Sequence, residues 1–286
     1  MSLSPDQRRQ LNLRVARYKV MYERSDPGDL LVLSPREGRY PSLEGYLCGQ
    51  LYKQGPERVL EERVLMRLIE QYMVQMRSSF PALFEWDDDV IPSAIVYWGI
   101  GGITAAMTGL EPMHEETTSW LEPSLEWGAI EELRFDEDNR WVQFALNLNR
   151  ALWRCWEEDF FVLPFLHRSP LDAANGIRGT ELFIDMYVDP ARVNTLTEWC
   201  ADWSIEIESF LCHHDGRSKG WGTGVWDVWL PEGTVFVNGD PVGLVSREMM
   251  REFEQPYTEK LFTRCGGGFF HNHSVGLYQV DQVAQT

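Results

Sequence analysis

Short apolar segments alternate with long amphipathic helices along most of this chain, and this alternation is the feature that most restricts its fold. The segments 91–98 and 160–166 are almost entirely apolar over the length of a buried strand. Around them, 59–77 and 141–156 repeat apolar residues at helical spacing. Strands that are buried on both faces and separated by helices are typical of a parallel sheet covered by helices.

The same pattern continues to the end of the chain. It yields about six strand candidates, whereas a closed (β/α)₈ barrel needs eight. The pattern therefore predicts an α/β fold with a parallel sheet covered by helices, and a barrel of the TIM (β/α)₈ type would be incomplete at about six of its eight strands. We expect one domain over 1–286 that begins with a helical extension over 1–25. The other strand candidates are 30–33, 225–230, 234–237 and 269–273, with a turn expected at 231–233. Pro256 is expected to break or kink the helix that begins at Ser246.

The charge of the chain excludes several classes of partner. With 44 acidic and 26 basic residues the net charge is −18, which disfavours nucleic acid and anionic membrane surfaces. No apolar run reaches the roughly 18 residues of a membrane-spanning helix. The N-terminus shows no secretory signal, and the five cysteines are scattered without a CxxC pair. These features predict a cytoplasmic protein with reduced thiols.

Four stretches, in order, carry a resemblance to a known family. The sequences are DVIPSAIVYWGIGGITAAMTG, SPLDAANGIRGTELFIDMYVDPARVNTLTEWCADW, GDPVGLVSREMMREFEQPYTEKLF and GGGFFHNHSVG. Together they resemble the uroporphyrinogen decarboxylase superfamily over roughly residue 87 to the end. The resemblance implies a (β/α)₈ barrel whose site lies at the C-terminal ends of the strands.

Two departures from the family pattern bear on function. The arginine-rich N-terminal signature of true uroporphyrinogen decarboxylases is absent, because SPREGRYPS offers only Arg36 and Arg39. Family members also continue for two further strand–helix units after the HNHS segment. We therefore expect an open barrel, which is either a truncated product or one completed by another chain.

His271 and His273 are the sharpest chemical feature of the sequence. Side chains two residues apart on a strand point to the same face, so both imidazoles could reach one metal at the barrel mouth. The resemblance implies zinc here, because related corrinoid-linked methyltransferases place a zinc-binding His-x-Cys at this point. His273 stands at the cysteine position. The alternative is that both histidines line a pocket by hydrogen bonding without a metal.

Three further polar residues follow strand candidates. Asp240 could bind a cation, orient His271 or contact substrate, or it could simply cap the turn before Pro241. His167 is a candidate third ligand or general acid–base, with a hydrogen-bonded structural histidine as the alternative. We take Asp240 and His167 as the catalytic candidates. Asp172 is a substrate-binding candidate that could equally cap the following helix.

Tyr97 and Trp98 end a predicted strand and could form the wall of a site for a flat ligand, with ordinary core packing as the alternative. The leading hypothesis is a methyltransferase-like enzyme. It would act on a small-molecule, tetrapyrrole or corrinoid substrate, with a corrinoid as methyl donor and a corrinoid protein as a candidate partner. A tetrapyrrole decarboxylase that needs no metal is the first alternative. The second is a non-catalytic barrel remnant or binding protein.

Overall fold

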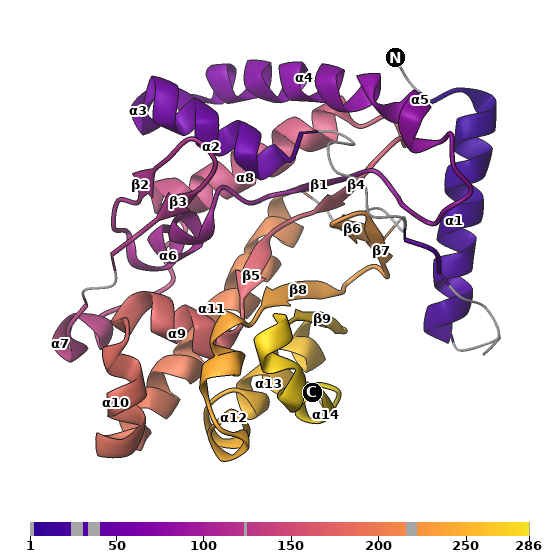
Figure 1. Cartoon of the computed structure of the whole chain (residues 1–286). Coiled ribbons are helices and arrows are strands. Elements are labelled where there is room, and N and C mark those ends of the chain that lie inside the picture. The colour runs from indigo at the N-terminus through magenta and orange to yellow at the C-terminus, as the bar shows by residue number, and fades with distance from the viewer. Residues whose placement is uncertain (1–2, 24–30, 34–40, 123–124, 216–221, 286) are drawn as a thin grey trace.

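The computed structural model of the chain describes residues 3–23, 31–33, 41–122, 125–215 and 222–285 (Figure 1). Parallel strands run through its centre, and helices lie around them. The expected strand at 30–33 begins outside the described residues, and its part at 31–33 forms no strand. None of the described helices is long and apolar enough to cross a membrane.

The central strands pair in parallel, each with a strand that lies further along the chain. The residue that follows β1 (Ser93–Ile95) connects the β1–β4 pair to the β5–β8–β9 sheet, because the N–H of Leu166 donates to the carbonyl of Val96 (3.3 Å). Pro164 separates β4 from β5, since proline cannot donate a ladder hydrogen bond. The pairs are β1 (Ser93–Ile95) with β4 (Phe161–Leu163), β5 (Leu166–Arg168) with β8 (Val235–Asn238), and β8 with β9 (Gly268–His271).

This run of parallel strands confirms the predicted parallel α/β arrangement, but a closed barrel is not shown. Among the described residues, the remaining strands form two antiparallel pairs. These pairs are β2 (Met113–His114) with β3 (Ser119–Trp120), and β6 (Thr223–Val225) with β7 (Val228–Leu230).

Helices cover the outer side of the strands. α11 packs against α8, α9 and α13, and α4 packs against α8. The break that Pro256 predicts lies between α12 and α13, where Pro256 occupies the first turn of α13. The helices are α1 (Pro5–Glu23), α2 (Leu43–Gln54), α3 (Pro56–Val59), α4 (Glu62–Ser78), α5 (Phe80–Leu83), α6 (Ile100–Thr108), α7 (Trp127–Ile130), α8 (Arg140–Cys155), α9 (Pro170–Arg178), α10 (Glu181–Val188), α11 (Pro190–Asp215), η1 (Asp240–Leu244), α12 (Arg247–Phe253), α13 (Gln255–Cys265), η2 (Ser274–Gln279) and α14 (Val280–Val283).

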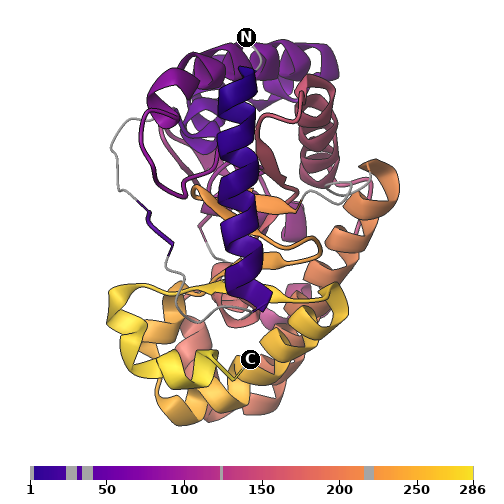
Figure 2. The same cartoon turned by 90° about the vertical axis from the view of Figure 1, so that its right-hand side faces the viewer.

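The β6–β7 hairpin packs against β1 and β4. Its approach is close, because a Cβ at Gly224 would lie 2.7 Å from the Cβ of Phe161. On its other side, α1 crosses the molecule (Figure 2), and Trp229 contacts the rings of Tyr18 and Tyr22. The sequence prediction of one strand over 225–230 is wrong, because the chain reverses within that segment at Trp226 and Asp227.

The buried carboxylate of Glu254 links the junction of α12 and α13 to the start of α9. It lies between α12 and α13, is fully buried, and accepts hydrogen bonds from the hydroxyl of Ser169 (2.9 Å) and the N–H of Leu171 (2.8 Å). The Thr258 hydroxyl donates to its other oxygen. Glu254 thus satisfies polar groups at the N-terminal end of α9. Burial raises the pKa of Glu254 to about 7.

This raised pKa predicts a pH-dependent contribution to stability. The folded protein keeps the Glu254 proton up to about pH 7, whereas the unfolded chain releases it near the ordinary value of 4.5. Between these values the folded state binds more protons, so stability falls as pH rises. Glu254→Gln lacks this titration. The wild-type free energy of unfolding minus that of the variant should therefore fall by roughly 2–3 kcal/mol between about pH 5 and about pH 8.

Urea unfolding of both proteins across this range measures the difference directly, and other titrating groups largely cancel because both proteins contain them. A difference that stays constant or rises with pH would contradict the assignment.

Candidate metal centre at the ends of strands β8 and β9

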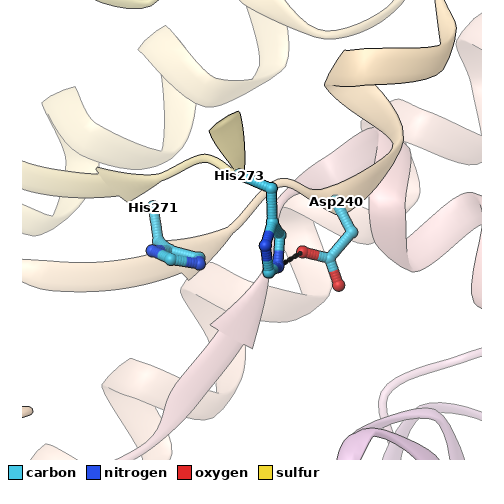
Figure 3. A group of neighbouring side chains, drawn as sticks. All are labelled: Asp240, His271 and His273. Atoms are coloured by element: carbon cyan, nitrogen blue, oxygen red, sulfur yellow. Dashed lines mark ion pairs between the residues drawn. The ribbon is translucent and has the colours of Figure 1, made fainter. Parts of the chain in front are cut away.

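Parallel pairing brings the ends of β8 and β9 to the same place. In this register Asn238 lies opposite His271, the last residue of β9. Asp240 follows two residues after Asn238, and His273 follows two residues after His271. The three side chains of Asp240, His271 and His273 consequently converge (Figure 3). We call these three residues the candidate metal centre.

The geometry of the candidate metal centre fits a single cation. A carboxylate oxygen of Asp240 and one ring nitrogen from each histidine all lie within 4.8 Å of one another. The Nε2 of His273 is 2.9 Å from Oδ1 of Asp240, and the two imidazole centroids are 5.0 Å apart at 77°. Two imidazole nitrogens and a carboxylate oxygen form a ligand set that zinc accepts, with a further position left for water or substrate.

His271 is the least exposed of the three ligands, and aromatic rings surround it. Trp226 and Phe236 contact its imidazole, with centroids 4.7 and 6.2 Å away. The pKa of His271 is lowered chiefly by burial and also by His273, while Asp240 acts in the opposite direction. The lowered pKa favours the neutral imidazole, which is the form that binds metals.

His167 lies on the other face of the sheet. In the middle of β5 it is buried, and its Nε2 is 2.9 Å from a carboxylate oxygen of Glu208 on α11. Its neighbour in the register, Val237, belongs to a small apolar cluster with Leu261 of α13. His167 is therefore directed toward the helical layer and does not join the candidate metal centre. This placement agrees with the alternative that His167 is a hydrogen-bonded structural histidine.

Arg168 and Asp172 form a buried ion pair that the sequence motifs did not predict. Arg168 lies opposite Asn238 in the register and donates to Oδ1 of Asp172 (2.8 Å) and to the hydroxyl of Thr104 (3.1 Å). Ser169 caps α9, so Asp172 is not the cap. In the sequence, this ion pair is indicated only by an arginine at a strand end, four residues before an aspartate.

The Arg168–Asp172 pair also leaves polar atoms unused. Nε of Arg168 and Oδ2 of Asp172 are buried and have no hydrogen-bond partner among the described residues. Burial raises the pKa of Asp172, and the attraction of Arg168 opposes this shift. Asp240 of the candidate metal centre adds to the upward pKa shifts of Asp172 and Arg168, so it lies within electrostatic range of the pair. Unsatisfied buried polar atoms of this kind are common where a ligand or water binds.

The adjacent side chains of Tyr97 and Trp98 lie in different surroundings. Trp98 is buried and packs on the rings of Trp141, Phe144 and Phe165, as expected for a core residue. Tyr97 is half-buried and hydrogen-bonded to Glu44. Burial and the Glu44 carboxylate raise the pKa of its hydroxyl, Arg168 opposes this shift, and Asp172 adds to it. Of the two, Tyr97 therefore lies nearer the polar groups that could contact a substrate.

Comparison with protein-family models gives no match, and comparison with curated protein sequences gives none either. Among solved structures, the fold is similar to a methyltransferase from Methanosarcina mazei, with a TM-score of 0.61. The alignment covers 95% of this chain and 73% of that one, at 11% sequence identity. The likeness establishes a shared fold.

The candidate metal centre predicts a zinc affinity that depends on its own residues. Wild-type protein should bind a single zinc ion, and His273→Ala or Asp240→Asn should weaken binding about tenfold or more. The first variant removes an imidazole ligand, and the second replaces the anionic carboxylate with a neutral amide. His213→Ala, which removes an exposed histidine near the end of α11, is the matched control and should bind like wild type. Calorimetric zinc titration of the four proteins measures this, and equal affinities would contradict the site.

Proposed function

We propose that this protein is a zinc-dependent, methyltransferase-type enzyme on an α/β fold similar to the uroporphyrinogen decarboxylase superfamily. The convergence of Asp240, His271 and His273 within 4.8 Å at the ends of two parallel strands carries the proposal. Active sites of barrel-like α/β enzymes lie at this end of the strands. The similarity to the fold of a methyltransferase supports the reaction class.

Zinc held by these residues would lower the pKa of a substrate thiol and keep it as the thiolate, the nucleophile that accepts a methyl group. The chain's own contribution is to hold and tune the ligands. Asp240 supplies negative charge next to His273, at 2.9 Å. The aromatic surroundings of His271 favour its neutral, metal-binding form.

The substrate would be recognised beside the metal by Tyr97, Arg168 and Asp172. The unused Nε–H of Arg168 is a donor and the unused Oδ2 of Asp172 is an acceptor. A substrate that carries both an acceptor and a donor, such as an amide, would satisfy both atoms. Because both side chains are buried, a substrate without these groups would leave them unsatisfied and bind less tightly.

The methyl donor is proposed to be a corrinoid or a methylated small molecule, with a corrinoid protein as the physiological partner in the first case. In the corrinoid reaction the cobalt–carbon bond breaks and a carbon–sulfur bond forms. The methyl group moves to sulfur and the bonding electron pair stays on cobalt, so methylcobalamin becomes cob(I)alamin. The thiol proton leaves to solvent when the thiolate forms.

This function is tested with zinc-loaded protein, free methylcobalamin and a panel of small thiols. The expected result is loss of the methylcobalamin spectrum with formation of the methyl thioether, at a rate at least tenfold lower in His273→Ala. His213→Ala is again the control and should match wild type. Without zinc, both variants should keep the wild-type melting temperature, because the two histidines are exposed.

Two outcomes favour the alternatives. Tight porphyrin binding that does not require zinc, with no methyl transfer, would favour a tetrapyrrole decarboxylase. Absence of both activities in folded, zinc-loaded protein would favour a non-catalytic binding protein.

A further inference from the structure

The tip of the β6–β7 hairpin has an unusual backbone. Trp226 and Asp227 both have positive φ values, 45° and 70°. Two-residue hairpin turns of this type are normally built from glycine, asparagine or aspartate, because other side chains clash with the backbone there. A tryptophan in this conformation carries an energetic cost that glycine would avoid. Such positions persist when another role requires the side chain.

Burial does not account for Trp226. Its side chain remains 50% exposed, so the hydrophobic gain from this residue is partial. Its ring instead makes two specific contacts, edge-on to Phe236 (4.8 Å, 81°) and edge-on to His271 (4.7 Å, 76°). The conformational cost at Trp226 therefore coincides with contact to a residue of the candidate metal centre.

The hairpin tip is firmly attached to the central strands. The N–H of Ile91 donates to the carbonyl of Asp227 (3.0 Å), and the N–H of Asp227 donates to the hydroxyl of Ser93 (3.3 Å). Gly224 lies so close to β1 and β4 that a Cβ would be 2.8 Å from Ile91 and 2.9 Å from Ser93. Trp226 is thus presented toward β9 from a fixed base.

His271 needs a restraint from outside its own strand. A metal-binding histidine is usually oriented by a hydrogen bond from its second ring nitrogen to a carboxylate or carbonyl. Between the described residues, no hydrogen bond to the His271 ring is formed. Its ring instead lies nearly parallel to Phe236 (26°) and perpendicular to Trp226. These two rings limit its rotation on one side, while His273 lies 5.0 Å away on another.

We propose that Trp226 is a positioning residue, whose indole holds the imidazole of His271 in the orientation that faces Asp240 and His273. The role rests on the proposed metal-dependent function. It explains why the turn keeps a large aromatic side chain at a position where glycine is favoured. Trp226 acts through His271 and makes no contact with the metal itself.

The decisive variants are Trp226→Gly and Trp226→Asn, since both residues tolerate positive φ and neither supplies a ring. Asp227→Gly is the matched control, because it changes the same turn and keeps the indole. Trp226→Phe is the conservative variant that should rescue the ring contact. Three properties are compared in the full chain: melting temperature, zinc affinity, and mobility of the His271 ring from ¹³C relaxation of histidine-labelled, metal-free protein.

We expect the two ringless variants to melt within about 4 °C of wild type, to bind zinc about tenfold more weakly, and to show a more mobile His271 ring. Asp227→Gly should match wild type in zinc affinity and ring mobility, and Trp226→Phe should recover most of both. Unchanged ring mobility and zinc affinity in Trp226→Gly and Trp226→Asn would overturn the proposal, as would a large loss of stability with unchanged affinity.

The relaxation measurement separates this proposal from the metal function. If wild-type protein binds no zinc, the metal function fails. Ring mobility in the metal-free variants still decides whether Trp226 restrains His271.

Discussion

The candidate metal centre depends on the parallel register of β8 and β9. Pairing of Asn238 with His271 brings the ends of the two strands together, and Asp240 and His273 then follow at equal offsets. A shift of one residue would turn every side chain of β9 to the opposite face and remove His271 from Asp240. Helix α13 supports this register from outside, because Leu261 packs in one cluster with Val237.

Successive side chains of the central strands point to opposite faces of the sheet. The candidate functional residues lie on one face, and the other face packs against helices. On β5, Arg168 shares its face with Asn238 of β8, while His167 is directed to α11 and binds Glu208. The same rule places His271 beside Phe236 rather than among the helices. The hairpin reaches this face, because Trp226 brings an aromatic ring to His271.

Much of this arrangement follows from local sequence patterns. Helical periodicity predicted a helix over 141–156 and the structure has α8 over Arg140–Cys155, while Pro256 predicted the break between α12 and α13. Spacing on an extended segment suggested that His271 and His273 share a face, and their side chains do converge on one point.

Other features depend on contacts that local patterns do not contain. The turn at Trp226 was not predicted, because 225–230 is mostly apolar and contains no glycine, a pattern that indicates a continuous strand. The face of His167 depends on how Pro164 interrupts the strand, and the Arg168–Asp172 pair depends on Ser169 taking the capping role. Closure of the sheet is equally a long-range property, so counting strand candidates could not establish it.

The most direct measurement is the location of zinc in crystals of the zinc-loaded protein, from anomalous diffraction at the zinc absorption edge. One strong peak is expected between Asp240, His271 and His273, within bonding distance of all three side chains. A zinc peak bound elsewhere, or histidine rings turned away from each other in a zinc-loaded crystal, would contradict this expectation.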